Sequence, residues 1–238
     1  LKKIFNMKIL ANDGISDSGV EELKKSGFEI ITTNVAQEQL ENYINTNNVV
    51  GLLVRSATTV RKDLIDKCPG LRLIGRGGVG MDNIDVDYAR SKGLAVINTP
   101  ASSSHSVAEL VFSHLFSCVR FLHDSNRNMP LEGDSNFKKL KKNYSKGTEL
   151  KGKTLGIIGF GRIGQETAKI ALGIGMNVIY YDKFIESVKI ELDFVMDKKI
   201  SFELKTSQLD NVLTDSDFIT LHVPAQKNYF IGKSEFEK

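Results

Sequence analysis

Short apolar segments of strand length alternate with amphipathic segments along the first half of the chain. The apolar runs predict strands at Met7–Leu10, Phe28–Thr32, Val50–Val54, Leu71–Gly75 and Leu94–Ile97. The segments between them have helical spacing, and the first of these helices is expected to begin after Ser16 and to end at Gly27. This alternation is typical of βα units, whose strands form a parallel sheet.

The second half of the chain repeats the alternation after a longer helical pattern. That pattern covers Ser104–Arg127, and a polar loop over Asn128–Gly152 follows it. Strands are then predicted at Thr154–Ile158, Asn177–Tyr181 and Phe218–His222, and helices at Arg162–Leu172 and Leu209–Thr214. We therefore predict an α/β protein with two Rossmann-like, doubly wound parallel-sheet domains, residues 1–98 and 99–238, the second including the long helix 104–127.

Composition narrows the function classes only a little. Hydrophobic residues make up 41% and charged residues 26% of the chain, and the net charge of +3 is too small to predict a nucleic-acid partner. The longest strongly apolar run, Val49–Val54, is far shorter than the roughly 20 residues of a membrane helix, and no targeting segment is visible. Cys68 and Cys118 stand far apart and are expected to be reduced thiols, so we predict a cytoplasmic protein.

A run of lysines lies within the predicted polar loop. It consists of Lys138, Lys139, Lys141, Lys142 and Lys146. Such a charge run is typical of a solvated surface, and a patch that binds polyanions is the alternative.

Two segments match the pattern G-x-G-x-x-G, and the second has the context that dinucleotide binding requires. The strand Thr154–Ile158 precedes Gly159, Gly161 and Gly164, a helix follows, and Asp182 ends the next strand 18 residues after Gly164. These glycines permit a tight turn, a close approach of the diphosphate and helix–strand packing. The start of the helix attracts phosphate, and Asp182 can accept hydrogen bonds from a ribose while repelling a 2′-phosphate. We therefore predict NAD as the cofactor.

The first match, Gly75–Gly80, lacks this context. The position that corresponds to the acid after the next strand is occupied by Asn98. Consecutive small residues can instead expose the backbone N–H groups of Gly77, Gly78 and Val79 at a strand end, as in anion-binding nests. We therefore predict a substrate carboxylate at this turn, and a simple tight turn is the alternative.

Several further segments match patterns of one dehydrogenase family. They are Gly75–Asp85, the hinge Asn98–Pro100, the helix start Ser106–Leu110, and Glu149–Leu150 with Gly152–Gly156 ahead of the glycine motif. Together with Gly159–Gly164 they resemble the D-2-hydroxyacid dehydrogenases over nearly the whole chain. Val54–Thr58 and Gly75–Arg76 resemble the phosphoglycerate dehydrogenases within that family.

The resemblance implies a role for each of the candidate site residues. A small anionic 2-hydroxy or 2-oxo acid is expected at Arg55, Ser56, Arg76, Gly77 and Gly78. NAD is expected at Val79, Gly159, Gly161, Arg162, Ile163, Gly164, Asp182, His222, Val223 and Pro224. His222 is expected to be a neighbour of the cofactor and not an acid–base catalyst, and no metal site is expected.

The family pattern implies that the catalytic arginine, glutamate and histidine lie beyond Lys238. No catalytic residue is therefore expected in this chain, which should be inactive by itself, with a second domain incomplete at its C-terminal end. The strand Phe218–His222 is expected to lack sheet neighbours and to leave an open apolar edge that favours aggregation. The helix Ser104–Arg127 resembles the family's dimer element, so we expect a homodimer for the complete protein.

The leading functional hypothesis is NAD-dependent oxidation of 3-phospho-D-glycerate to 3-phosphonooxypyruvate, which begins serine synthesis. Arg55 and Arg76 favour a substrate that carries a phosphate. The alternatives are another D-2-hydroxyacid dehydrogenase, acting on glycerate, hydroxypyruvate or lactate, and a non-catalytic module that binds NAD.

Overall fold

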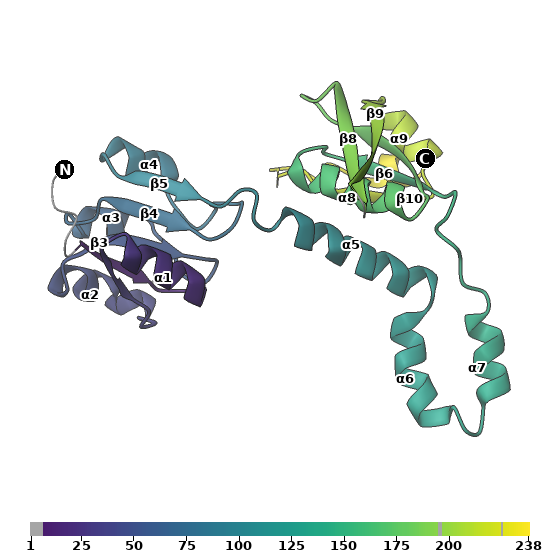
Figure 1. Ribbon diagram of the computed structural model, residues 1–238, viewed down its shortest axis with the longest axis horizontal. Helices are drawn as coiled ribbons and strands as arrows, with labels where there is room; N and C mark the ends of the chain where they lie inside the picture. Colours follow the sequence, from purple (N-terminus) through teal and green to yellow (C-terminus); the bar gives the residue numbers. More distant parts are fainter. Residues whose placement is uncertain (1–6, 195–196, 225) are drawn as a thin grey trace. The chain divides into compact units, whose positions relative to one another are not determined.

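The computed structural model describes residues 7–194, 197–224 and 226–238, and it divides into two compact units (Figure 1). The first unit ends at Ser103 and the second begins at Ser104. This division lies five residues after the boundary that the sequence predicts. It coincides with the start of a helix, because the segment between Asn98 and Ser104 has no regular structure of its own to join either sheet.

The first unit is a five-stranded parallel sheet with short helices between the strands. Its strands are β1 (Met7–Ala11), β2 (Phe28–Ile31), β3 (Val49–Val54), β4 (Leu73–Arg76) and β5 (Ala95–Asn98), in the order β2-β1-β3-β4-β5. The helices are α1 (Asp17–Lys25), the 3₁₀ turn η1 (Gln37–Gln39), α2 (Leu40–Thr46), α3 (Lys62–Lys67) and α4 (Val86–Ser91). The five predicted strands are confirmed, with ends that differ by one or two residues.

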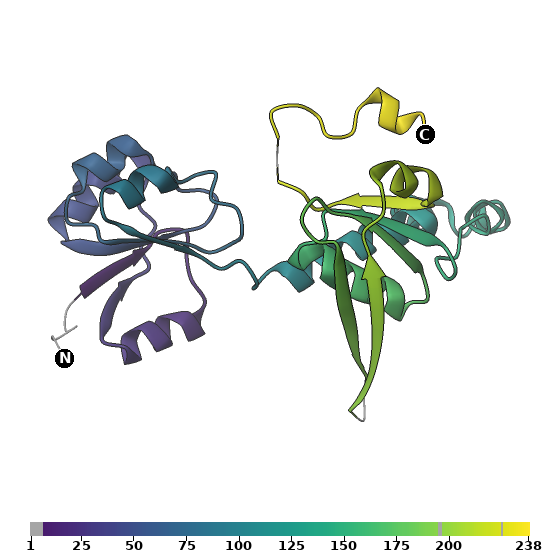
Figure 2. The same cartoon turned by 90° about the horizontal axis from the view of Figure 1, so that it is seen from above.

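Alternation along the strands decides which face of this sheet is buried. Leu52, Val54 and Ile74 are almost fully buried and pack with Leu40 and Ile44 of α2 in one hydrophobic core. Figure 2 shows α1, drawn in purple, on one face of the sheet and the later, bluer helices on the other. The α1 face therefore has less helical cover, and a cavity lies along it.

Both predicted signals for the ends of α1 are confirmed. The Ser16 hydroxyl accepts a hydrogen bond from the Gly19 N–H at 3.2 Å, which is the usual bond of an N-cap serine. Gly27 has a φ of 90°, a left-handed conformation that glycine adopts without strain.

The second unit contains a three-stranded parallel sheet, an antiparallel hairpin and several helices. Its strands are β6 (Thr154–Ile158), β7 (Asn177–Tyr181), β8 (Ser187–Phe194), β9 (Lys198–Lys205) and β10 (Phe218–Leu221). Its helices are α5 (Ser104–Val119), α6 (Leu122–Glu132), α7 (Phe137–Tyr144), α8 (Arg162–Gly173), α9 (Leu209–Asp215) and α10 (Lys233–Phe236). The sheet order is β10-β6-β7, so the glycine motif follows the central strand.

The prediction of one long helix over Ser104–Arg127 is wrong. The helix ends at Val119, and Phe121 adopts a left-handed conformation with a φ of 55° before α6 begins. A φ in this region interrupts the helical hydrogen-bond ladder, so the chain changes direction between α5 and α6. No glycine or proline lies at the break between Val119 and Leu122, so the sequence did not reveal it.

The prediction of a polar loop over Asn128–Gly152 is also wrong. The first part of that range belongs to α6, and α7 follows it alongside (Figure 1). The Tyr144 hydroxyl donates to Asp124 at 2.9 Å and accepts from Asn128 at 3.2 Å, which ties the two helices together. Leu140 is the buried residue of α7, so its apolar face is too narrow to predict a helix from hydrophobic spacing.

The sequence analysis missed the hairpin of β8 and β9. Val188, Ile190 and Leu192 alternate with charged residues, which is the pattern of a strand with one buried face. Ile190 pairs with Phe202 across the hairpin and is 1% exposed, because this face packs on the core of the second unit. The unit is therefore not an uninterrupted series of βα units, although its three-stranded sheet is parallel as predicted.

The strand β10 keeps one sheet neighbour, so the prediction that it loses its neighbours is wrong in part. It pairs with β6 along its length. Its other edge has no partner strand among the described residues, and Ile219 and Leu221 are 39% and 47% exposed there.

Candidate active site

Two glycines of the Gly159–Gly164 turn are required by the packing of the protein itself. Gly159 has a φ of 91°, and a Cβ added there would lie 2.7 Å from the carbonyl oxygen of His222. A Cβ on Gly164 would collide with the carbonyl oxygen of Gly159. These contacts bring β6, α8 and the end of β10 together around the turn.

Gly161 is different, because nothing in the protein occupies the space beside it. Its φ of −66° is open to any residue, and no atom lies within 4 Å of an added Cβ. Gly161 also precedes α8, whose first N–H groups receive no side-chain cap. An open approach to the uncapped start of a twelve-residue helix fits a diphosphate group. The residues present therefore fit the cofactor that the sequence predicts.

Asp182 lies at the end of β7 beside this turn, and its carboxylate already binds the backbone. One carboxylate oxygen accepts the Phe160 N–H at 2.6 Å, and the other accepts the N–H groups of Phe184 and Ile185 at 2.8 and 3.1 Å. Partial burial raises the pKa of Asp182, but the three N–H donors outweigh it and hold the pKa below its usual range. Asp182 is therefore an anion that also fixes the glycine-rich turn.

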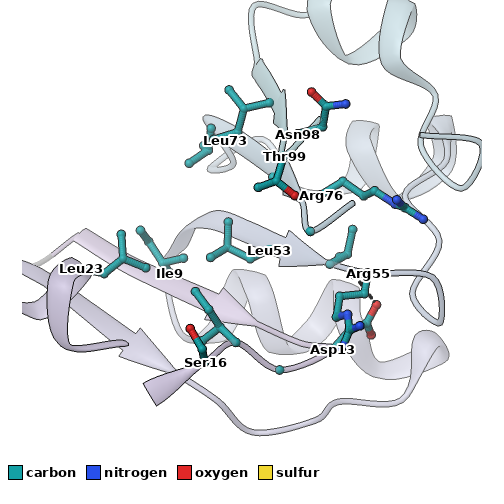
Figure 3. A pocket seen from close by; sticks show the side chains of 16 residues that line it. Ile9, Asp13, Ser16, Leu23, Leu53, Arg55, Leu73, Arg76, Asn98 and Thr99 are labelled. Atoms are coloured by element: carbon teal, nitrogen blue, oxygen red, sulfur yellow. Dashed lines mark hydrogen bonds between the residues drawn. The ribbon is translucent and has the colours of Figure 1, made fainter. Parts of the chain in front are cut away.

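A cavity of about 770 Å³ lies along the α1 face of the first unit (Figure 3). Its floor is apolar and is formed by Ile9, Leu23, Leu53, Leu73 and Ile97. At the carboxyl ends of β3, β4 and β5 its lining is polar and consists of Arg55, Arg76, Gly77, Asn98 and Thr99. The predicted substrate-binding arginines thus meet at one end of one cavity, the edge where open α/β sheets bind ligands.

Each of the two arginines lies against one of the glycines that follow β4. The Arg55 Cγ lies 3.5 Å from the position of a Cβ on Gly77, and the Arg76 guanidinium occupies the place of a Cβ on Gly78. Within residues 7–194, 197–224 and 226–238, neither guanidinium forms an ion pair, and the Arg76 Nε is buried without a hydrogen-bond partner. The cavity therefore has two guanidinium groups outside any ion pair of the described residues, and such groups suit an anionic ligand.

The prediction that the backbone N–H groups of Gly77 and Gly78 are free for a carboxylate is wrong. The Gly77 N–H donates to the Val54 carbonyl, and the Gly78 N–H donates to the Thr99 hydroxyl, both at 2.8 Å. Thr99 returns a backbone hydrogen bond to the Gly78 carbonyl at 3.2 Å. The sequence could not show this, because the acceptors belong to two other strand ends.

A sequence profile of the D-isomer specific 2-hydroxyacid dehydrogenase catalytic domain matches residues 9–227. The chain belongs to this dehydrogenase family. The D-3-phosphoglycerate dehydrogenase of Methanocaldococcus jannaschii is 37% identical over 236 residues, which are 96% of this chain and 41% of that protein. The hydroxypyruvate reductase of Thermotoga maritima is 38% identical over 218 residues, which are 91% of this chain and 65% of that protein.

Solved structures of other proteins share the fold. The 3-phosphoglycerate dehydrogenase of Entamoeba histolytica with NAD⁺ bound superposes with a TM-score of 0.66 at 27% identity, covering 93% of this chain and 64% of that one. The TT0316 protein of Thermus thermophilus gives a TM-score of 0.74 at 24% identity, covering 93% and 66%. The chain thus spans about two fifths of the M. jannaschii phosphoglycerate dehydrogenase and about two thirds of these solved chains.

The segment His222–Pro224 borders the glycine-rich turn. The His222 N–H donates to the Ile158 carbonyl at 2.7 Å, and the Val223 side chain lies close to Gly159. The His222 Nε2 contacts the Thr167 and Thr220 hydroxyls at 3.4 and 3.2 Å. Burial lowers the pKa of His222, and its ring contacts hydroxyl groups and no carboxylate of the described residues. The geometry therefore suits a neutral cofactor neighbour better than an oriented acid–base catalyst.

Two side chains that hold the arginine-bearing loop were not predicted from the sequence. Asp13, just after β1, accepts hydrogen bonds from the backbone N–H groups of Arg55 and Thr58 at 2.6 and 3.1 Å. Asn83 donates to the carbonyl groups of the same two residues at 2.8 and 2.6 Å. The position of Asp13 at a strand's carboxyl end was the available signal, whereas nothing in the sequence pairs Asn83 with residue 55.

The two cysteines do not belong to the site described above. Cys68 is buried, and this burial raises the pKa of its thiol to about 11, while Cys118 is exposed. Among the described residues no group of His, Cys, Asp or Glu has a metal-binding arrangement, and no helix is long and apolar enough to cross a membrane.

Proposed function

We propose that this chain is part of a cytoplasmic, NAD-dependent dehydrogenase that oxidises 3-phospho-D-glycerate to 3-phosphonooxypyruvate, the entry to serine synthesis. The observation that carries the proposal is that two guanidinium groups, those of Arg55 and Arg76, lie at one end of the cavity. Neither forms an ion pair with a described residue. One anionic carboxylate would need only one of them, and a phosphorylated hydroxy acid matches both. Similarity to several D-3-phosphoglycerate dehydrogenases supports the same substrate.

The proposed roles follow from where each residue lies. Arg55 and Arg76, with Ser56 beside them, bind the two anionic groups of the substrate and so hold its C2 hydroxyl at the end of the cavity. Val79, which is 42% exposed beyond Gly78, is assigned to the nicotinamide side. When bound, NAD accepts the hydride that leaves the substrate's C2 carbon.

We further assign the cofactor site to the Gly159–Gly164 turn and Asp182. Gly161, Arg162 and Ile163 present open backbone to the diphosphate, and Asp182 supplies the negative charge at the ribose. Because Asp182 stays ionised, it disfavours the 2′-phosphate of NADP. The proposed preference is therefore NAD over NADP.

The substrate proposal is tested by replacing each cavity arginine with glutamine. Arg55→Gln and Arg76→Gln should each weaken binding of 3-phospho-D-glycerate by roughly tenfold or more, because each loses a charge-assisted hydrogen bond. Binding of D-glycerate, which lacks the phosphate, should change much less in at least one variant. Arg72→Gln, an exposed arginine of the same unit, is the matched control. Equal losses for both ligands in both variants would contradict a phosphate site.

The second candidate is a hydroxypyruvate or glycerate dehydrogenase. It is favoured by the T. maritima hydroxypyruvate reductase, of which this chain covers a larger share than of the M. jannaschii phosphoglycerate dehydrogenase. This candidate predicts tighter binding of hydroxypyruvate than of the phosphorylated acid. A lactate dehydrogenase or a non-catalytic NAD-binding module would show cofactor binding with no preference for phosphorylated acids.

We also propose a homodimer that is built on α5. Leu110 and Phe116 are 55% and 39% exposed on this helix, and Leu122 and Leu131 of α6 are 51% and 79% exposed. Apolar side chains gathered on neighbouring helices are typical of a subunit interface.

A further inference from the structure

The loop that carries Arg55 is held from two sides by two side chains of opposite hydrogen-bonding character. Asp13 accepts hydrogen bonds from the N–H groups at both ends of the segment from Arg55 to Thr58, at 2.6 and 3.1 Å. Asn83 donates hydrogen bonds to the carbonyl groups of the same two residues, at 2.8 and 2.6 Å. The four-residue loop is thus closed by a carboxylate that only accepts and an amide nitrogen that only donates.

The chemistry of each clamp residue matches its side of the loop. An ionised carboxylate provides acceptor sites for several N–H groups, and the two hydrogens of the Asn83 amide nitrogen serve the two carbonyls. A carboxylate at position 83 would face the two carbonyl oxygens and could not donate to either of them. Buried neighbours support the arrangement, since Thr58 is 4% exposed and receives a hydrogen bond from Asn12, which is 3% exposed.

The clamp also occupies the carboxylate oxygens of Asp13, so that they bind the loop and not the Arg55 guanidinium. Asp13 lies in the cavity lining near Arg55, where a carboxylate could otherwise form an ion pair with it. Its oxygens are instead directed to the backbone of the loop and to the Thr58 hydroxyl. The Arg55 guanidinium therefore forms no ion pair with it and stays available at the end of the cavity.

We propose that Asp13 and Asn83 are positioning residues that hold the Arg55–Thr58 loop so that Arg55 binds the phosphate of the substrate. This inference rests on the proposed function, in which Arg55 and Arg76 bind the two anionic groups of the substrate. The inference adds that the phosphate is the group bound by Arg55. The hydrogen bonds of both residues go to the loop, so their effect on the substrate is exerted through Arg55. They act on recognition of the phosphorylated acid and not on the cofactor.

The test compares two ligands in variants of this chain, with NADH present at saturation and affinities measured by calorimetry. Asp13→Ala and Asn83→Ala should each weaken binding of 3-phospho-D-glycerate by roughly tenfold, because each removes the hydrogen bonds that hold the loop. Binding of D-glycerate should weaken by less than about twofold, and NADH affinity should not change. Asp87→Ala, which removes a carboxylate at an exposed position of the same unit, should behave as wild type.

Amide hydrogen exchange followed by NMR supplies a second measurement that does not depend on the substrate. The Arg55 and Thr58 amides should exchange at least about tenfold faster in Asp13→Ala, which lacks any acceptor, while amides in β6 keep their rates. Unchanged exchange at these two amides would overturn the clamp, and equal losses for both acids would overturn its role in phosphate recognition. If the wild-type chain binds neither acid, the proposed function fails, and the exchange rates still decide whether the clamp exists.

Discussion

Glycines 159 and 161 lie two residues apart and are glycines for different reasons. At Gly159 the protein itself excludes a side chain, since the backbone is left-handed and the His222 carbonyl fills the space. At Gly161 the backbone is ordinary and the space is open. A residue that is glycine without a structural need indicates an external molecule that must come close.

Alanine substitutions at these two glycines should therefore separate stability from binding. Gly159→Ala should destabilise the second unit by about 1–3 kcal/mol, because its left-handed backbone disfavours a Cβ. Gly161→Ala should change stability by less than about 0.5 kcal/mol and weaken NAD binding at least about tenfold. Urea unfolding and calorimetric titration with NAD measure the two effects. A loss of stability in Gly161→Ala as large as that in Gly159→Ala would contradict this interpretation.

The Asp182 carboxylate gives the same turn a dependence on pH. Its pKa is lower in the folded chain than its ordinary value near 3.8, so the ionised form stabilises the fold. This contribution is fully present above the unfolded-state pKa and is lost as the pH falls through the folded-state pKa. In Asp182→Asn the contribution is absent at every pH.

We expect the unfolding free energies of wild type and Asp182→Asn to differ at pH 7 and to converge in acid. Urea unfolding at pH 7, 5, 4 and 3, followed by a probe in the second unit, measures the difference. Asp215, an exposed acid of the same unit, provides Asp215→Asn as the control. A difference that stays constant down to pH 3 would show that the carboxylate charge is not involved.

At the scale of elements, the hairpin of β8 and β9 has a buried base and an exposed end. Ile190 is 1% exposed and packs on the core, whereas Ile200, on the same face near the other end, is 49% exposed. The α8 helix covers only the base of this hairpin. The same residue type thus has two environments on one face.

Alanine substitutions should report this gradient along the hairpin. Ile190→Ala should cost about 2–5 kcal/mol of stability, the range for a fully buried large side chain. Ile200→Ala should cost less than about 1 kcal/mol, because half of its surface is already in water. Thermal unfolding of the two variants measures the ratio. Equal costs would mean that the exposed end of the hairpin is covered in solution.

At the scale of the whole molecule, each unit has its own hydrophobic core. The core of the first unit is built from residues up to Ala89, and that of the second begins with Phe112. The exposed apolar side chains of α5 and α6 belong to neither core. Their exposure is the reason to expect a second copy of the chain there.

Charged residues at these positions should therefore prevent dimer formation. Leu110→Glu and Phe116→Glu should shift the chain from dimer to monomer in sedimentation velocity, because burying an unpaired carboxylate is costly. Asn211→Glu adds the same charge at an exposed position of α9 and should leave the oligomeric state unchanged. A wild-type chain that sediments as a monomer would rule out this interface for the 238-residue chain.

The sequence by itself determined the features that depend on local pattern. Alternating apolar runs predicted the parallel strands, and the order strand, Gly159–Gly164, helix, Asp182 predicted the position of the cofactor turn. Motif resemblance predicted the dehydrogenase family, which the profile match shows. These features are readable because spacing along the chain fixes them.

Only the tertiary structure decided which groups are free to bind. The Gly77 and Gly78 N–H groups are consumed by Val54 and Thr99, which are distant in sequence. The turn at Phe121 and the partners of Asn83 likewise depend on packing between elements. Hydrogen-bonding groups that meet across strand ends leave no periodic trace in the sequence, so their pairing could be learned only from the fold.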